Sequence, residues 1–388
     1  MTNKILILNN ISDKGLALLP EDNYAITEEE QNPDAILLRS YKMHDMDIPN
    51  SLLAVGRAGA GTNNIPIDKM SEQGVVVFNA PGANSNAVKE LVIAGMLMAC
   101  RNLVAAKEYV DDLEGEDAEL HKQVEAGKKM YGGFELPGRT LGVVGLGAIG
   151  VKIANAAKAL GMNVIGYDPR IQIKYAWQLS SDVEPVDTIE ELLAQSDFIT
   201  FHVPLLDSTK DLINADSIKG MKDNAIVLNF ARDGIVNDEA VVDAIQQGKL
   251  HSYVCDFPSN TIKGAKGVIA LPHLGASTTE AEENCATMVA VQVRDYIENG
   301  VIKNSVNMPD VKLPRAGECR VAIVHKNSPD MVSQISSVLG NSSANIHHMV
   351  NDSRGDLAYT LMDVDSKLSD DSVTALLAIE GVLKVRLL

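Results

Sequence analysis

One short stretch, LGVVGLGAIG at residues 141–150, restricts the fold of this chain more than any other feature. A run typical of a strand leads into it and a run typical of a helix leaves it, and Gly145, Gly147 and Gly150 have the spacing G-x-G-x-x-G. Such a turn lets backbone N–H groups and a helix N-terminus approach a pyrophosphate. The stretch predicts a Rossmann domain that binds a dinucleotide; a purely structural strand–turn–helix is the alternative.

The next expected strand ends at Asp168, in the sequence GYDPR. A carboxylate at this place accepts hydrogen bonds from a ribose diol and would repel a 2′-phosphate. Asp168 therefore favours NAD over NADP as the cofactor, whereas the nearby Arg170 would suit NADP.

Length and charge narrow the class of protein. With 388 residues, 46% of them apolar, the chain can bury two or three cores. Its net charge of −18 argues against nucleic acid or an anionic membrane as partner, so an anionic ligand needs a local basic pocket. The apolar run at 91–100 is too short to span a bilayer, and no signal peptide is recognisable. The scattered cysteines have no metal-ligand spacing and suit reduced thiols, so we expect a cytoplasmic protein without a metal.

Three domains are expected from the order of apolar runs and helical patterns. Residues 1–98 and 278–310 predict a discontinuous, flavodoxin-like substrate-binding domain, and residues 99–277 the Rossmann NAD-binding domain. Residues 318–388 read as strand, helix, strand, strand, helix, strand, the pattern of a ferredoxin-like module. The fold class is therefore α/β with two doubly wound domains, and the cleft between them is the expected site.

Two side chains at expected strand ends have the chemistry of a dehydrogenase. Arg232 in NFARDG and His273 in PHLGAS both follow apolar runs of the second domain. Because ligands of open α/β sheets bind at the carboxyl ends of the strands, we expect them to meet at the nicotinamide. An imidazole can exchange a proton with a hydroxyl, and a guanidinium can hold a carboxylate in a bidentate manner. A capping histidine is the alternative for His273.

The chain resembles the D-isomer-specific 2-hydroxyacid dehydrogenases over nearly its whole length. The segments GRAGAGTNNI, VFNAPGANSNAVKELVIAGML, LGVVGLGAIG, HVPLLDST, NFARDGIVN, CDFP and PHLGAS follow one another in the order of that family. The resemblance implies NAD-dependent oxidation of D-3-phosphoglycerate to 3-phosphohydroxypyruvate in L-serine biosynthesis, with His273 as acid and base and Arg232 orienting the substrate carboxylate.

The resemblance also assigns binding residues. The expected substrate contacts are Arg39, Ser40, Arg57, Asn84 and Arg232, where the arginines would supply the basic pocket. The expected cofactor contacts are Gly145, Gly147, Ala148, Ile149, Gly150, Asp168, His202, Val203, Pro204, Thr209, Phe230, Ala231, Arg232, Asp256, His273, Gly275 and Ala276.

One position departs from the family pattern. Family members carry a glutamate five residues after the position of Asp256, where it bonds the histidine, and this chain has Thr261 there. The segment SNTIKGAKG offers only lysines as charged groups, and Asp256 is expected to contact the nicotinamide amide instead. We therefore expect either an active dehydrogenase whose acid limb lies at lower pH or a slow one.

The C-terminal module resembles an ACT domain, the ligand-sensing unit of amino-acid enzymes. The resemblance places His325, Asn327 and Asn345 where an effector such as L-serine binds between paired modules. Asp330 stands where a glycine is usual and would repel an amino acid's carboxylate. A simple helix cap is the alternative for this polar cluster.

Two other functions stay open, and an oligomer is expected. Another 2-hydroxyacid dehydrogenase, such as a glyoxylate or hydroxypyruvate reductase, would not need Arg39 and Arg57 for a phosphate. An NAD-sensing binding protein of the corepressor kind would share the fold, and Thr261 is consistent with it. The long apolar helices, with the run at 91–100, suggest a homodimer or homotetramer.

Overall fold

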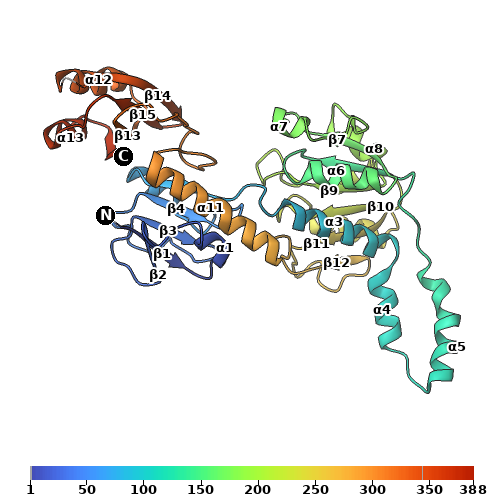
Figure 1. Ribbon diagram of the computed structural model, residues 1–388. Helices are drawn as coiled ribbons and strands as arrows, with labels where there is room; N and C mark the ends of the chain where they lie inside the picture. The colour runs from blue at the N-terminus through green and yellow to red at the C-terminus, as the bar shows by residue number, and fades with distance from the viewer. Residues whose placement is uncertain (1, 343) are drawn as a thin grey trace. The chain divides into compact units, whose positions relative to one another are not determined.

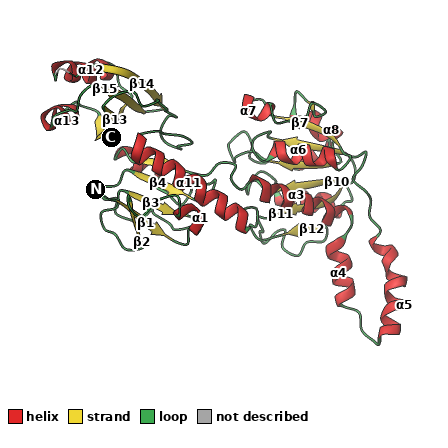
Figure 2. Ribbon diagram, viewed as in Figure 1, coloured by secondary structure: helices red, strands yellow, loops and turns green. Residues whose placement is uncertain are grey.

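The structure is a computed structural model that describes residues 2–342 and 344–388 (Figures 1 and 2). The chain divides into two compact units, which are Met1–Asn84 with Thr279–Leu388, and Ser85–Thr278. In the part of the chain that is described, no helix combines the length and the apolar character that crossing a membrane requires.

The first unit contains a parallel sheet of five strands in the order β2-β1-β3-β4-β5. This is the flavodoxin-like order, as the fold class predicted. The strands are β1 Asn3–Leu8, β2 Tyr24–Thr27, β3 Ala35–Leu38, β4 Ala54–Arg57 and β5 Val76–Phe78, and the helices are α1 Asp13–Leu16, α2 Ile67–Glu72 and α11 Thr279–Asn299. Every residue of β3 and β5 is buried, as expected for a sheet covered on both faces.

The second unit is built on a parallel sheet of seven strands in the order β12-β11-β10-β9-β6-β7-β8. From β8 to β11 this is the Rossmann order, which confirms the prediction from the glycine turn. The strands are β6 Thr140–Val144, β7 Asn163–Tyr167, β8 Glu184–Pro185, β9 Phe198–Phe201, β10 Ala225–Asn229, β11 Leu250–Cys255 and β12 Val268–Ala270. The helices are α3 Ser85–Cys100, α4 Leu103–Asp111, α5 Asp117–Gly127, η1 Lys128–Tyr131, α6 Gly150–Ala159, α7 Ile173–Ala176, α8 Ile189–Gln195, α9 Ala215–Lys219 and α10 Asp238–Gln246.

Helix α3 lies in the second unit along its whole length, whereas the sequence placed the boundary at residue 98. Val92 and Met96 of α3 are fully buried in one apolar core with Leu141 of β6 and Ile153 of α6. The unit therefore covers most of the apolar run at 91–100 itself. This corrects the argument that the run needs a second subunit to cover it.

The C-terminal residues form the ferredoxin-like module expected from the sequence. An antiparallel sheet in the order β14-β15-β13-β16 is covered on one face by two helices. The elements are β13 Cys319–Lys326, α12 Met331–Asn341, β14 Ile346–Arg354, β15 Leu357–Val364, α13 Asp370–Leu377 and β16 Val382–Leu387.

The other face of this small sheet packs on the rest of the first unit and shares its core. Val324, Tyr359 and Leu361 are buried in one cluster with Tyr296 and Ile297 of α11. The contact continues in hydrogen bonds to the C-terminal end of α11. The module therefore forms one packed body with the first sheet and α11.

Two arginines of the module cap α11. Arg386 donates from Nη1 to the carbonyl of Tyr296 (3.1 Å) and from Nη2 to that of Ile297 (2.6 Å), and Arg320 donates to the carbonyl of Asn299 (3.0 Å). The last carbonyls of a helix lack partners within it and carry partial negative charge, so guanidinium groups satisfy both needs.

Candidate active site

The glycine turn after β6 has the shape that a pyrophosphate needs. Gly145 has φ 91°, and a Cβ there would lie 2.6 Å from the carbonyl oxygen of His202. A Cβ on Gly150 would lie 1.9 Å from the carbonyl oxygen of Gly145, whereas a Cβ on Gly147 would meet no described atom within 4 Å. The first and third glycines are therefore required by packing, while Gly147 faces open space, with Ala148 and Ile149 completing the turn into α6.

Asp168, directly after β7, lies beside this turn. Its Oδ2 accepts a hydrogen bond from the N–H of Leu146 (2.8 Å), and its Oδ1 accepts one from the N–H of Arg170 (2.9 Å). These bonds fix the carboxylate at the edge of the turn, and each oxygen keeps a second lone pair for a ligand hydroxyl. The structure thus brings together the two features that predicted the cofactor.

His202 follows β9 and is held neutral. Its Nε2 is 2.8 Å from Oγ1 of Thr200, and its Nδ1 is buried without a hydrogen-bond partner among the described residues. Burial lowers the pKa of His202 to about 3. In the following loop, which includes Val203, Thr209 donates from Oγ1 to the carbonyl of Pro204 (2.6 Å) and accepts from the N–H of Leu206 (2.8 Å).

Arg232 lies exposed in the turn after β10, and a buried asparagine shapes that turn. Asn229 donates from Nδ2 to the carbonyl of Arg232 (2.9 Å) and accepts at Oδ1 from the N–H of Ala231 (3.2 Å). Phe230 and Ala231 are buried between them. Asn229 was not predicted from the sequence, although its position as the polar residue that ends the run AIVLN was the available signal.

Asp256 and His273 come from different strand ends and lie close together. Asp256 is 1% exposed, and its Oδ2 accepts a hydrogen bond from the N–H of Gly275 (3.3 Å). Burial raises the pKa of Asp256, while the charge of His273 and the backbone N–H groups oppose this rise. Its Oδ1 has no partner among the described residues.

His273 is exposed, and its ring packs against the ring of Phe257, with the two ring centroids 4.8 Å apart. Ala276 follows Gly275 in the same turn and is half-buried. Thr261 is exposed, in a turn between Asn260 and the fully buried Ile262. The position of the family's glutamate thus supplies His273 with no carboxylate.

In the first unit, Arg39 and Arg57 stand at the ends of adjacent strands. Leu38, the residue before Arg39, pairs with Arg57 in the sheet, and Nε of Arg57 donates to the carbonyl of Arg39 (3.1 Å). A Cβ on Gly59 would lie 2.3 Å from Nη1 of Arg57, so the guanidinium lies against this glycine. The two arginines expected to hold an anion are therefore neighbours.

Neighbouring polar residues support this basic edge. Asn64 donates from Nδ2 to the carbonyls of Arg39 (3.2 Å) and Tyr41 (2.7 Å), and so fixes the loop that carries the exposed Ser40. Asn84 has a buried Oδ1 without a partner among the described residues. Asn64 was not predicted from the sequence, where nothing distinguished it from a turn residue.

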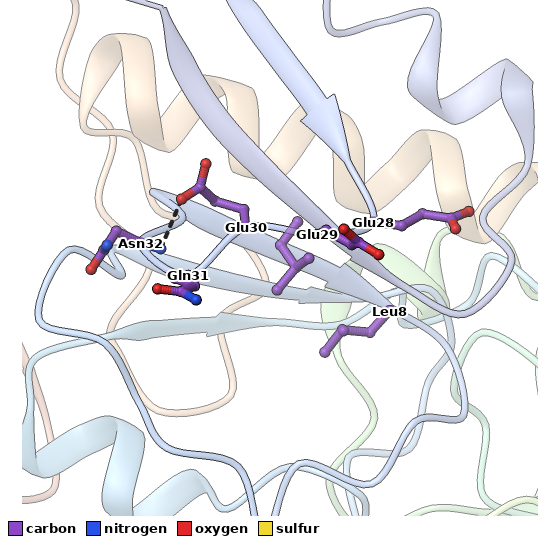
Figure 3. Close-up of a pocket in the computed structure, with 7 residues that line it drawn as sticks. Leu8, Glu28, Glu29, Glu30, Gln31 and Asn32 are labelled. Carbon is purple, nitrogen blue, oxygen red and sulfur yellow. Dashed lines mark hydrogen bonds between the residues drawn. The ribbon is translucent and has the colours of Figure 1, made fainter.

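A pocket at the same edge of this sheet has the opposite charge (Figure 3). It is lined by Leu6, Leu8, Glu28, Glu29, Glu30, Gln31 and Asn32. Glu30 accepts from the N–H of Asn32 (2.9 Å) and pairs with Lys4 (3.2 Å), and these two partners hold its pKa below the ordinary value. A pocket with three glutamates disfavours an anion. The strand ends that carry Arg39 and Arg57 are therefore the better candidate for binding an anionic ligand.

The residues predicted to bind an effector lie at two ends of the C-terminal sheet. His325 is 1% exposed, with Nδ1 2.8 Å from the carbonyl of Lys326 and Nε2 2.9 Å from Oγ1 of Thr360. Asn327 donates from Nδ2 to the carbonyl of Gly355 at the same end (3.1 Å). Asn345 is exposed at the other end, where β14 meets the end of β15.

The second unit combines a turn shaped for a pyrophosphate with an imidazole and a guanidinium at strand ends of the same sheet. Buried polar atoms without partners among the described residues, Nδ1 of His202 and Oδ1 of Asp256, leave hydrogen bonds for a bound cofactor. This arrangement defines a nicotinamide-dependent dehydrogenase.

The sequence model of the D-isomer specific 2-hydroxyacid dehydrogenase NAD-binding domain matches residues 93–275. The chain belongs to the D-isomer-specific 2-hydroxyacid dehydrogenases, a family of NAD-dependent oxidoreductases.

Individual relatives agree with this assignment. A D-3-phosphoglycerate dehydrogenase of Haemophilus influenzae is 32% identical over 87% of this chain and 81% of its own length. A D-3-phosphoglycerate dehydrogenase of Methanocaldococcus jannaschii is 35% identical over 82% of this chain. This chain spans only 62% of the length of that relative. The structure of an NAD+-bound 3-phosphoglycerate dehydrogenase of Entamoeba histolytica is similar with a TM-score of 0.61 and 25% identity, covering 79% of this chain and 99% of that one.

Proposed function

We propose that the protein oxidises D-3-phosphoglycerate to 3-phosphohydroxypyruvate with NAD, as a step of L-serine biosynthesis. The observation that carries the choice of substrate is the pair Arg39 and Arg57 at adjacent strand ends of a chain with net charge −18. Guanidinium groups bind phosphate and carboxylate with matched geometry. The relatives named D-3-phosphoglycerate dehydrogenase support the same choice.

The roles of the residues follow from their chemistry. NAD, when bound, supplies the hydride acceptor. The turn at Gly147 would hold its pyrophosphate and Asp168 its ribose. Arg232 orients the substrate carboxylate, and His273 takes the proton of the C2 hydroxyl as C2 is oxidised. Asp256, whose buried Oδ1 has no partner among the described residues, would contact the nicotinamide amide.

The proposal is tested by following NADH oxidation with purified full-length protein and 3-phosphohydroxypyruvate, glyoxylate or 2-oxoglutarate across pH. Turnover of the phosphorylated substrate is expected. Its absence, with turnover of another 2-oxo acid, would contradict the proposal.

Arg39→Ala and Arg57→Ala test the substrate class. Each should raise KM for 3-phosphohydroxypyruvate by roughly tenfold to a hundredfold, because a charge-assisted hydrogen bond to phosphate is lost. KM for unphosphorylated hydroxypyruvate should change less. Equal changes for the two substrates would favour a reductase for unphosphorylated acids.

A second candidate function is an NAD-sensing binding protein. The exposure of His273 and the absence of a glutamate at Thr261 favour it. The single tryptophan, Trp177, is 85% exposed nine residues after Asp168 and gives a binding signal independent of turnover. NADH binding without turnover of any 2-oxo acid would support this alternative.

We infer a cytoplasmic homodimer or homotetramer. Helices α4 and α5 project from the second unit (Figure 1), and Leu103, Val110 and Met130 in this region are 48%, 52% and 69% exposed. Exposed apolar side chains on a projecting arm suit contact with a second copy of the chain. Sedimentation of the full-length protein would show a single monomer if this inference is wrong.

We also propose three functional parts and an effector. The first sheet with α11 binds the substrate, residues 85–278 bind NAD, and the C-terminal module is regulatory. L-Serine is the proposed effector at His325, Asn327 and Asn345 of paired modules.

A further inference from the structure

A carboxylate already occupies the basic edge that the proposed function gives to the phosphate. Glu282 lies in the first turn of α11, and its Oε1 is 2.5 Å from Nη1 of Arg39. The two side chains are 43% and 34% exposed, so the ion pair is open to solvent and to ligands. Arg57 donates to the carbonyl of Arg39 and belongs to the same edge.

The thiol of a neighbouring cysteine responds to the same three charges. Cys285, one turn further along α11, is 3% exposed. Burial raises the pKa of its thiol, Arg39 and Arg57 lower it, and Glu282 raises it.

The next residue of α11 serves a different cation. Glu283 pairs with Lys14 of α1, with Oε2 and Nζ 2.7 Å apart. Successive helix residues point about 100° apart around the axis, which separates the two ion pairs. Glu283 thus provides a matched control for Glu282.

We propose that Glu282 is a specificity-determining residue that competes with the substrate's phosphate for Arg39. This inference rests on the proposed function. In the free protein the carboxylate neutralises Arg39, and a phosphate that binds there must displace it or lie beside it. Either event weakens the binding of a doubly charged phosphate more than that of an uncharged group.

The competition affects binding rather than chemistry. The phosphate does not react, so interactions with it contribute about equally in the bound substrate and in the transition state. Glu282 therefore sets KM for phosphorylated substrates and leaves the hydride step alone. By weakening phosphate binding it also shortens the residence of a phosphorylated product.

Glu282→Gln tests the proposal in the full-length protein, with Glu283→Gln as control. We expect E282Q to lower KM for 3-phosphohydroxypyruvate by roughly threefold to tenfold, the range of a partly exposed charge interaction. The KM of E282Q for hydroxypyruvate should not fall. E283Q should keep the wild-type KM for both substrates. An unchanged or raised KM for the phosphorylated substrate in E282Q would overturn the inference.

A binding measurement separates this inference from the proposed function. Inorganic phosphate is titrated calorimetrically into the wild type, E282Q and Arg39→Ala without substrate. E282Q should bind phosphate more tightly and R39A more weakly than the wild type; equal binding by wild type and E282Q overturns the inference. A wild type that does not turn over 3-phosphohydroxypyruvate contradicts the proposed function alone, because the phosphate titration still decides the role of Glu282.

Discussion

The nucleotide turn of the second unit and the C-terminal module use similar residues for opposite purposes. At the turn, Gly147 faces open space, and buried atoms of His202 and Asp256 lack partners among the described residues. In the module, both ring nitrogens of His325 contact Lys326 and Thr360. The difference teaches that a polar residue at a strand end is the better candidate for binding where it retains hydrogen-bonding capacity.

The glycine turn gives the largest test of this comparison. Gly150→Ala should lower the free energy of unfolding by roughly 4 kcal/mol or more, because its Cβ would lie 1.9 Å from the backbone oxygen of Gly145. Gly147→Ala should unfold at the wild-type temperature but bind NADH at least about tenfold more weakly, because its methyl group fills the space for the pyrophosphate. Thermal unfolding and Trp177 fluorescence measure the two quantities.

The contrast between the two variants is the control. If G147A bound NADH as tightly as the wild type, the open space at this turn would not be the pyrophosphate site.

The sequence predicted those parts of the molecule that depend on neighbours along the chain. The glycine turn, Asp168 and the strand order of both parallel sheets follow from local patterns, and the structure has them. The capping of α11 by Arg386 could not be predicted, because the two lie about 90 residues apart and only the packed fold brings them together. The pairing of Arg39 with Glu282 escaped prediction for the same reason.

The buried ion pair of the C-terminal module gives the next largest effect. Arg320 and Asp363 are 1% and 0% exposed, with Nε–Oδ1 and Nη2–Oδ2 distances of 2.7 and 2.8 Å. Arg320→Met leaves the carboxylate buried and unpaired, and should lower the free energy of unfolding by about 3–5 kcal/mol. This would show that the ion pair of Arg320 and Asp363 stabilises the module.

The stability lost in Arg320→Met should depend on pH. Burial alone would raise the pKa of Asp363, but the hydrogen bonds from Arg320 and Ala316 and the positive charge outweigh it, so its pKa is lowered. The pair therefore stabilises the fold above the ordinary pKa of an aspartate, and this contribution disappears as pH falls through the lowered value. Urea unfolding of the wild type and R320M at several pH values measures this contribution. The difference in free energy of unfolding between the two proteins should shrink in acid, and a difference that grows in acid would contradict this account.

His202 sharpens the comparison on the side of the nucleotide turn. Its pKa is about 3 in the folded protein and about 6.5 in an unfolded chain, so between these values only the unfolded chain binds the proton. Stability should therefore fall as pH falls from 7 to 5, by about 2 kcal/mol from this residue. Urea unfolding without nucleotide measures this effect. Between pH 7 and pH 5 the free energy of unfolding of His202→Asn should fall by less than that of the wild type. The same pH dependence in both would mean that His202 is protonated in the fold.

The smallest expected effect is that of L-serine. An amino acid that uses His325 must replace its bonds to Thr360 and Asn351, and the charge of Asp330 opposes a carboxylate in the nearby loop. We therefore expect inhibition only at millimolar L-serine, with a small rise in melting temperature, and neither change with D-serine. His325→Gln should abolish the response to L-serine but keep the rate measured without it. If L-serine changes neither the rate nor the melting temperature of the wild type, His325 has only the structural role that its buried bonds already give it, and the module acts through its contacts with α11.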